Sequence, residues 1–359
     1  MKSFYITTPI YYINFSPHIG HAYTSIACDI LARYNKLLGN DVYFLSGTDE
    51  HGQKVEQAAN NQSLKPQDFA DKMSVQFKDL ISFLNCETND FIRTTETRHK
   101  KAAQALWNKL LDNNQIYLSN YEGWYSIRDE AFYSENELIK KDGKFIAPSG
   151  AEVEWIKEES YFFKLSEWQD RLIDFYNNNP KSILPESRFN EVLSFIKSGL
   201  KDLSVSRTTF AWGVPVPNNP KHVMYVWIDA LCNYLTSIGY PDENSANFKN
   251  YWPALHIVGK DILRFHSVYW PAFLMAAGLE PPSRVFAHGW WTNEGEKISK
   301  SLGNVIDPYE IVSKYGLDQI RFFLFREVPF GNDGDFSKEA IAQRLNADLS
   351  NNYGNLVQR

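Results

Sequence analysis

A short apolar strand, a long helical pattern and a second apolar strand follow one another at the start of the chain. This order constrains the fold more than any other feature. Residues 4–6 and 42–45 are apolar runs that predict the two strands. Between them, apolar residues recur three or four apart from Ile19 to Leu38, which is typical of a helix. Continuous apolar strands joined by a helix predict neighbouring strands of a buried parallel sheet.

The same alternation returns near the end of the chain. Residues 256–258 and 284–287 predict strands, and residues 262–277 predict a helix between them. A further helical pattern at 69–84 belongs to the first half. We therefore expect an α/β fold with a doubly wound, Rossmann-like parallel sheet, interrupted by an insertion.

The start of the first helix carries a histidine pair. Ser16 is a suitable N-cap and Pro17 suits the first helical position, which places His18 and His21 in the first turns. A helix N-terminus presents unpaired N–H groups and positive charge, so two imidazoles there predict a site for phosphate. Gly20 lacks a side chain, which would let a nucleotide base approach the backbone.

A second segment, at residues 297–301, places two lysines three residues apart with only small or aliphatic residues between them. The preceding residues 293–295 predict a turn. This pattern suits a loop that closes ammonium groups over a triphosphate. Alone, a histidine pair is usually a polar surface and a lysine loop is usually solvated, but together the two segments favour one nucleotide site.

These two segments resemble the hallmarks of class I aminoacyl-tRNA synthetases, and the rest of the chain resembles the methionyl-tRNA synthetase family. The resemblance extends from Tyr5 to the last residue. Its most specific further parts are residues 8–12, 47–52, 225–230 and 259–262, followed by His266 and Trp270.

The resemblance implies three sets of site residues. The catalytic set comprises His18, His21, Lys297 and Lys300. The ATP-binding set comprises Gly20, Gly259, Asp261, His288, Gly289, Ser299 and Ser301. The methionine-binding set comprises Pro9, Ile10, Tyr12, Asp49, Arg207, Trp227, Ala230, Leu231, Tyr234, Ile262, His266 and Trp270. An aromatic pocket suits methionine, whose side chain is unbranched and polarizable.

Three charged residues in these sets have individual roles by resemblance. Asp49 is expected to bind the α-ammonium of the substrate, Asp261 the ribose hydroxyls, and Arg207 the substrate carboxylate. Leu231 departs from the family pattern, since many members have proline there, and this puts the pocket shape in doubt.

By resemblance, the expected function is ATP-dependent activation of L-methionine and its transfer to the 3′ end of tRNA(Met), a ligase reaction of translation. ATP and Mg²⁺ are expected to take part. Many relatives hold zinc in a knuckle, whose first Cys-x-x-Cys aligns with Ser126 and Asp129 here, and no cysteine lies between Cys86 and Cys232. We therefore expect no zinc and no other protein-bound metal.

Four domains are expected. Residues 1–112 and 222–335 form the two halves of the catalytic domain, the second with the lysine loop. Residues 113–221 form the inserted domain with its zinc-free knuckle, and residues 336–359 form the first helix of an anticodon-binding domain. The apolar stripe of that helix, which ends at Leu356, needs partner helices. Either the chain is truncated, and charges tRNA weakly as a monomer, or the helix packs back on the body.

Charge and cysteine content exclude few classes of protein. The net charge of −6 does not indicate a nucleic-acid binder, so contacts with tRNA must come from local basic patches. Three well-separated cysteines make a disulfide framework improbable, and there is no signal peptide or membrane-spanning run. These features favour the cytoplasm and exclude a membrane partner.

Two rival interpretations stay open. Another class I synthetase, for an aliphatic amino acid, shares both hallmarks, but it usually carries a larger editing insertion. A non-catalytic tRNA-binding paralogue is the other rival, although such a protein has little reason to retain all the catalytic residues.

Overall fold

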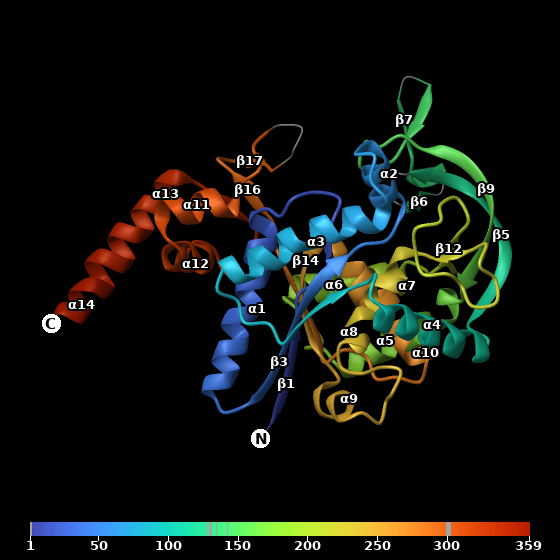
Figure 1. Cartoon of the computed structure of the whole chain (residues 1–359), viewed down its shortest axis with the longest axis horizontal. Helices are drawn as coiled ribbons and strands as arrows, with labels where there is room; N and C mark the ends of the chain where they lie inside the picture. Colours follow the sequence, from blue (N-terminus) through green and yellow to red (C-terminus); the bar gives the residue numbers. More distant parts are fainter. Residues whose placement is uncertain (1, 127, 129–130, 134, 142, 299–302) are drawn as a thin grey trace.

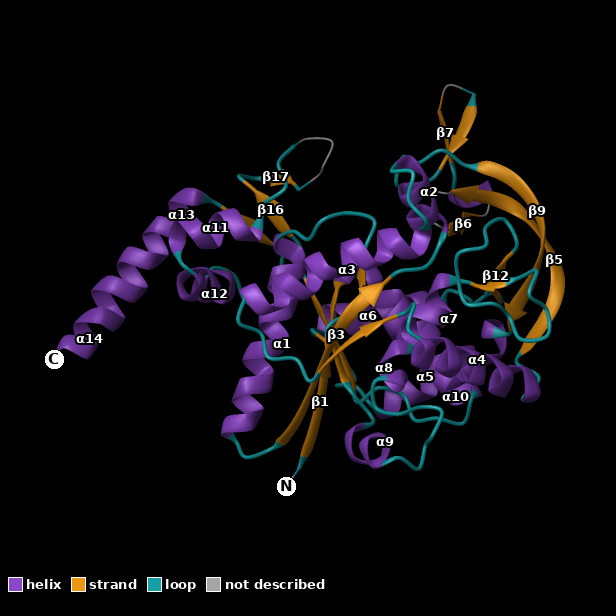
Figure 2. Ribbon diagram, viewed as in Figure 1, coloured by secondary structure: helices purple, strands orange, loops and turns teal. Residues whose placement is uncertain are grey.

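A parallel sheet forms the centre of the computed structural model, which describes residues 2–126, 128, 131–133, 135–141, 143–298 and 303–359 (Figures 1 and 2). The strand order is β10-β15-β14-β1-β3-β2, and β4 pairs with β3. The strands are β1 (Ser3–Thr7), β2 (Tyr11–Tyr12), β3 (Asp41–Asp49), β4 (Asp90–Arg93), β10 (Ile183–Leu184), β14 (Leu255–Gly259) and β15 (Arg284–His288). The predicted α/β class is confirmed.

The two faces of the sheet bury separate hydrophobic clusters. Tyr5 and Leu45 belong to one cluster, whereas their neighbours Ile6 and Phe44 belong to the other. Successive side chains of a strand point to opposite faces, so continuous apolar strands need cover on both sides. Helices provide this cover, which makes the sheet doubly wound as predicted (Figure 2).

The first half contains the two helices predicted at 19–38 and 69–84, together with two helices that were not predicted. They are α1 (Ile19–Leu37), α2 (Gln53–Asn61), α3 (Pro66–Phe83) and α4 (Thr97–Asp112). The predicted start of α1 is wrong, because His18 and not Ser16 is its N-cap. The cap therefore lies two residues after the predicted one. The His18 side chain accepts the hydrogen bond from a helical amide that a serine cap would accept.

The predicted helix at 262–277 has three different geometries. A 3₁₀ turn (Lys260–Ile262) and a π-helical turn (Phe265–Tyr269) precede α10 (Trp270–Ala276). Pro271 has no N–H to donate to the carbonyl four residues back. That carbonyl, of Ser267, accepts a hydrogen bond from the Tyr176 hydroxyl at 2.5 Å instead.

The segment between the two halves forms an antiparallel sheet beside them. Its strand order is β11-β9-β5-β6. These strands are β5 (Ile116–Ser126), β6 (Ala131–Tyr133), β9 (Glu154–Phe163) and β11 (Leu203–Ser204). The same segment also returns to the central sheet, because β10 pairs in parallel with β15.

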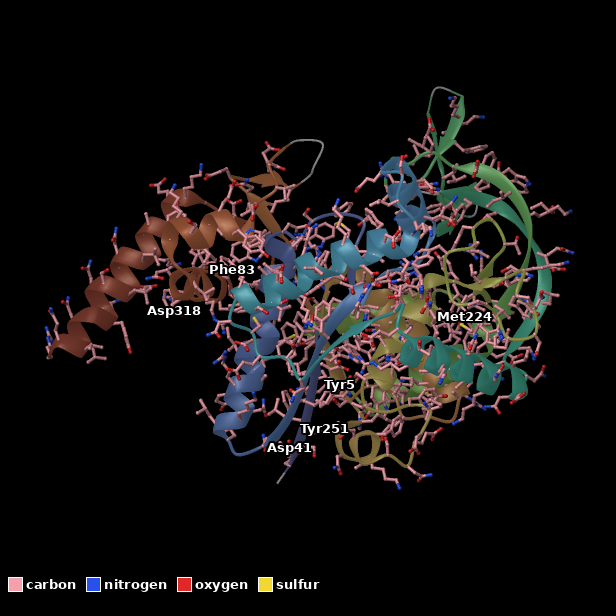
Figure 3. The ribbon with its side chains drawn as sticks, viewed as in Figure 1. Tyr5, Asp41, Phe83, Met224, Tyr251 and Asp318 are labelled. Atoms are coloured by element: carbon pink, nitrogen blue, oxygen red, sulfur yellow. The ribbon has the colours of Figure 1, made fainter. Side chains whose placement is uncertain are left out.

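Smaller elements complete this middle part. They are β7 (Ile139–Lys141), β8 (Lys144–Ile146), α5 (Gln169–Asn178), α6 (Glu186–Lys197), β12 (Ser206–Arg207), β13 (Val223–Met224), α7 (Val226–Leu231), α8 (Asn233–Thr236) and α9 (Ala246–Tyr251). Side-chain contacts join α9 to the sheet, since the Tyr251 hydroxyl donates to Asp41 at 2.9 Å (Figure 3).

The C-terminal part carries a small sheet and then helices. The strands are β16 (Trp291–Asn293), β17 (Glu296–Lys297) and β18 (Gly334–Phe336), and the helices are α11 (Pro308–Tyr315), α12 (Leu317–Arg326), α13 (Lys338–Arg344), a π-helical stretch (Leu345–Gly354) and α14 (Asn355–Gln358). Ser337 caps α13, since its side chain accepts a hydrogen bond from the Ala340 amide.

The last helical stretch projects away from the body (Figure 1). Ile341 is buried, but Tyr353 and Leu356 are 63% and 70% exposed. The predicted alternative in which this helix packs back on the body is therefore wrong. None of the helices in the described part of the chain is long and apolar enough to cross a membrane.

Candidate active site

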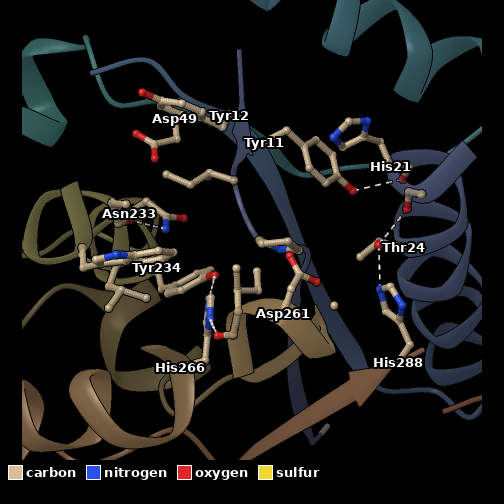
Figure 4. A pocket seen from close by; sticks show the side chains of 18 of the residues that line it. Tyr11, Tyr12, His21, Thr24, Asp49, Asn233, Tyr234, Asp261, His266 and His288 are labelled. Atoms are coloured by element: carbon tan, nitrogen blue, oxygen red, sulfur yellow. Dashed lines mark hydrogen bonds between the residues drawn. The ribbon is translucent and has the colours of Figure 1, made fainter. Parts of the chain in front are cut away.

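A cavity of about 560 Å³ opens where β1, β3, β14 and β15 end (Figure 4). In doubly wound sheets, ligands bind beyond the carboxyl ends of the strands. Sixteen residues of the predicted sets line this cavity: Pro9, Ile10, Tyr12, His18, Gly20, His21, Asp49, Trp227, Ala230, Leu231, Tyr234, Gly259, Asp261, Ile262, His266 and His288.

The two histidines of α1 form a reciprocal cap at the helix start. Nδ1 of His18 accepts a hydrogen bond from the Gly20 amide at 3.1 Å, and Nδ1 of His21 accepts one from the His18 amide at 3.0 Å. A ring nitrogen that accepts carries no proton, so each neutral imidazole holds its proton on Nε2. The cap thus gives both rings an N–H donor on the side opposite the backbone.

Gly20 is required by the position of His18. A Cβ atom on Gly20 would lie 2.9 Å from Cε1 of His18, closer than ordinary van der Waals contact. The absence of a side chain therefore leaves room for the imidazole as well as for a ligand. The sequence argument considered only the ligand.

His288, at the end of β15, is tied to the second turn of α1. Its Nδ1 lies 2.8 Å from the Gly289 carbonyl oxygen, and its Nε2 lies 2.8 Å from the Thr24 hydroxyl. Burial lowers the pKa of His288, which favours the neutral ring. A neutral ring that donates from Nδ1 has Nε2 as an acceptor, so the Thr24 hydroxyl lies between this nitrogen and the Gly20 carbonyl oxygen, to which it donates at 3.0 Å.

Asp261 lines the same end of the cavity and is held by Trp290. The indole N–H of Trp290 donates to the Asp261 carboxylate at 3.1 Å. The ring of Trp290 also lies under the Lys260 ammonium, 4.4 Å from the ring centroid, and Lys260 pairs with Asp333. These contacts fix one carboxylate oxygen of Asp261.

The other end of the cavity contains a buried tyrosine and histidine. Burial lowers the pKa of His266 to about 4, so its ring is neutral. Its Nδ1 lies 3.0 Å from the Ile262 carbonyl oxygen and must donate to it. Its Nε2 then accepts the hydroxyl proton of Tyr234, at 2.7 Å.

The aromatic wall of this end stands on α7. Trp227 stacks on Phe265 with a centroid distance of 3.5 Å and an interplanar angle of 10°. Asp229, two residues further along the helix, is fully buried and binds His51 at 2.6 Å and His99 at 2.7 Å. Burial alone would raise the pKa of Asp229, but the two histidines hold it below its ordinary value. This network fixes α7 against the loop after β3.

Asp49 ends β3 and lines the cavity at the end that also contains Tyr234 (Figure 4). Its side chain is 7% exposed, so its charge is largely removed from water. Lys54 of α2 lies over the ring of Tyr12 at 5.6 Å and also lines the cavity. The buried carboxylate can bind a cation here.

Three predicted residues do not line the cavity. Arg207 is buried, donates to the Ser204 hydroxyl at 2.8 Å and stacks on Tyr225 at 4.1 Å. Trp270 is fully buried behind the cavity wall. Gly289 lies against another segment of backbone, where a Cβ would come within 2.3 Å of Asn332. Their roles in substrate binding stay predictions.

The lysine segment is only partly described. The turn predicted at 293–295 is confirmed, since β16 and β17 form a hairpin in which Glu294 and Gly295 have positive φ. Lys297 is the last residue of β17. Ser299, Lys300 and Ser301 lie outside the described residues.

Five further residues line the cavity, and the sequence argument did not assign them to it: Tyr11, Thr24, Lys54, Asn233 and Trp290. Thr24 lies one turn after Gly20, and Trp290 lies two residues after His288. Helical periodicity could have identified Thr24 as a lining residue, and proximity to His288 could have identified Trp290.

Metal ligands are not clustered in the described residues. No group of three or more His, Cys, Asp or Glu side chains that could hold a metal ion occurs among them. Ser126, which aligns with the knuckle of relatives, is buried in β5. Asp129 lies outside the described residues.

The comparison with known proteins gives one consistent result. The family model described as tRNA synthetases class I (M) matches residues 4–359. The methionine–tRNA ligase of Rickettsia felis is 62% identical over 359 residues, which cover all of this chain and 69% of that protein. The methionine–tRNA ligase of Brucella suis is 58% identical, with 100% and 70% coverage.

Solved structures agree with the sequence comparison. The methionyl-tRNA synthetase of Mycobacterium tuberculosis in complex with methionyl-adenylate superimposes with a TM-score of 0.97 at 53% identity, over 100% of this chain and 71% of that one. The apo form of the enzyme from the same organism has a TM-score of 0.87 at 50% identity, over 100% and 68%.

Proposed function

Since this chain belongs to the methionyl class I tRNA synthetases, we propose that its cavity activates L-methionine with ATP for transfer to the 3′ end of tRNA(Met). One observation carries the proposal. A single cavity joins a helix N-terminus with two imidazoles to an aromatic pocket with a buried carboxylate. The first part suits phosphate, and the second suits an amino acid with an apolar side chain.

The activation step needs no protein nucleophile. The methionine carboxylate is already ionised and attacks the α-phosphorus of ATP, and the bond to pyrophosphate breaks as the methionyl adenylate forms. The tRNA ribose hydroxyl then attacks the acyl carbon and releases AMP. The protein contributes position and charge stabilisation.

The Nε2–H groups of His18 and His21 are the donors for the phosphate charge, because the reciprocal cap uses both Nδ1 atoms as acceptors. The resemblance assigns the remaining phosphate contacts to Lys297, Ser299, Lys300 and Ser301. Mg²⁺ prefers phosphate oxygens and keeps several waters, so an ion bound to ATP would neutralise charge on the leaving pyrophosphate.

Nucleoside recognition belongs to the strand ends. Asp261 accepts from the ribose hydroxyls with the oxygen that Trp290 leaves available. Gly20 and Gly259 leave room for the nucleotide, and His288 holds the second turn of α1 through Thr24.

Selection of methionine belongs to the aromatic end. Asp49 binds the α-ammonium, and Pro9, Ile10 and Tyr12 flank the side chain. The wall comprises Trp227, Ala230, Leu231, Tyr234, Ile262 and His266. Trp270 and Arg207 are buried outside the cavity lining, and the roles that the resemblance implies for them stay predictions. The stack of Trp227 on Phe265 gives this wall a flat face for the polarizable sulfur.

For the domain organisation we propose the predicted division. The catalytic domain comprises residues 1–112 and 222–335, the insertion comprises residues 113–221, and a helical segment comprises residues 336–359. We also propose that the protein acts in the cytoplasm as a monomer without a bound zinc ion.

Pyrophosphate exchange into ATP tests the proposal. We expect exchange with methionine and not with leucine, isoleucine or valine, and we expect Lys300→Ala to lose most of it. The exposed residue Tyr34 on α1 offers a control, Tyr34→Ala, that should keep full exchange. Exchange with another aliphatic amino acid, or with none, would contradict the proposal.

A further inference from the structure

The side chain of Asn233, at the start of α8, has a fixed orientation in the cavity (Figure 4). Its Nδ2 donates to the Ala230 carbonyl oxygen at 2.6 Å. The reverse orientation would bring two oxygen acceptors together, so the amide cannot turn over at low cost. The carboxamide oxygen therefore faces the cavity.

This oxygen is a buried acceptor without a hydrogen-bond partner among the described residues. Asn233 is only 1% exposed. The nearby hydroxyl of Tyr234 does not supply a proton, because it donates to Nε2 of His266, whose Nδ1 is committed to the Ile262 carbonyl. A buried acceptor that lacks a donor destabilises the fold, so its retention points to a ligand that donates.

We propose that Asn233 accepts a hydrogen bond from the α-ammonium of the bound amino acid and shares this cation with Asp49. Both side chains line the same end of the cavity, away from the phosphate-binding start of α1 (Figure 4). A primary ammonium has three N–H donors, so one carboxylate oxygen does not saturate it. This assignment rests on the proposed function and adds a second recognition residue to it.

Two inhibitors that differ only in the amino group test the assignment. Methioninol carries the ammonium, whereas 4-(methylsulfanyl)butan-1-ol lacks it, and neither can form an adenylate. Their inhibition constants against methionine-dependent pyrophosphate exchange are measured for the wild type and Asn233→Ala. We expect the constant for methioninol to rise about tenfold or more in the variant, since a hydrogen bond to a charged group is lost. The constant for the amine-free alcohol should stay unchanged.

Thr236→Val is the matched control on the same helix. The substitution removes the Thr236 hydroxyl, which donates to the backbone carbonyl of Cys232 as the Asn233 amide donates to that of Ala230. Thr236 does not line the cavity. This control should leave both inhibition constants unchanged. An equal rise for both inhibitors in Asn233→Ala would overturn the assignment, because it would show a structural effect on the wall. No change for either would overturn it as well.

Two outcomes separate this inference from the proposed function. A wild type without methionine-dependent exchange refutes the function itself, whatever Asn233 does. If Asn233→Ala does not fold, Asp49→Ala answers the same question. If Asn233 is a second acceptor, the Asp49→Ala variant should still bind methioninol more tightly than the amine-free alcohol. Equal inhibition constants for the two compounds in this variant would contradict the assignment.

Discussion

His18 and His21 cap the same helix through the same ring nitrogen. The Nδ1 atom of His18 accepts the Gly20 amide at 3.1 Å, and the Nδ1 atom of His21 accepts the His18 amide at 3.0 Å. The structural role of each ring thus sets its tautomer, which leaves Nε2 as the donor for a phosphate. Capping and catalysis use opposite sides of the same imidazole.

The two roles of His18 can be separated by substitution. Asparagine is among the best N-cap residues, so His18→Asn should keep the thermal unfolding midpoint of the wild type. His18→Ala should lower the free energy of unfolding by about 1 kcal/mol. Both variants lose the Nε2 donor, and pyrophosphate exchange should fall by about 10² to 10³ in kcat. Full exchange in a well-folded His18→Asn would show that the cap is its only role.

Gly20→Ala should move the His18 ring, because the new Cβ would lie 2.9 Å from Cε1 of His18. We expect kcat of exchange to fall by about tenfold to a hundredfold, within the range for one misplaced donor. The KM for methionine should stay unchanged, since the amino-acid end is not touched. An unchanged kcat would mean that the ring relaxes without loss.

Trp290→Phe should weaken ATP binding and spare methionine binding. The substitution removes the N–H that donates to Asp261 but keeps an aromatic face for Lys260. Because Trp290 is 42% exposed, we expect the KM for ATP to rise only about threefold to tenfold. Trp155→Phe, on the remote strand β9, is the control. Equal effects of the two substitutions on the KM for ATP would refute the role of the indole.

The stability should decrease as the pH falls below neutrality. Burial lowers the pKa of His266 to about 4 from an ordinary 6.5, so the unfolded chain binds this proton first. The stabilising contribution is complete above pH 6.5 and is lost as the pH falls toward 4, by at most about 3 kcal/mol. Thermal unfolding between pH 7 and 5 measures it.

His266→Gln is the variant for this measurement, since glutamine does not titrate. Its unfolding midpoint should depend less steeply on pH than that of the wild type. Some dependence should remain, because burial also lowers the pKa of His256 and His288. Identical slopes for wild type and variant would show that His266 is not the group responsible.

Elemental analysis should find less than about a tenth of a zinc ion per chain, because structural zinc needs four thiolate or imidazole ligands. Exchange measured with excess Mg²⁺ after treatment with a zinc-selective chelator should equal that of untreated protein. Stoichiometric zinc would contradict the predicted metal-free knuckle.

The sequence alone determined the sheet, its crossover helices and most of the cavity lining. Apolar runs at β1 and β3 and the periodicity of α1 are local patterns, and a buried strand or an amphipathic helix follows from them directly. The motifs at His18 and Asp49 stand at strand-to-helix connections, so the parallel topology brings them to one edge. Sixteen residues predicted from these patterns and from the family resemblance line the cavity.

Tertiary structure alone decided how the side chains pair. The sequence around residue 233 does not indicate that its amide oxygen is turned toward a cavity. The amide orientation depends on the hydrogen bond to the Ala230 carbonyl. The oxygen lacks a donor because the Tyr234 hydroxyl donates its hydrogen bond to His266. The return of β10 to the central sheet and the burial of Arg207 are likewise set by contacts between distant segments. A sequence pattern reports which face of an element is apolar, whereas hydrogen-bond partners and desolvation arise only when the elements pack.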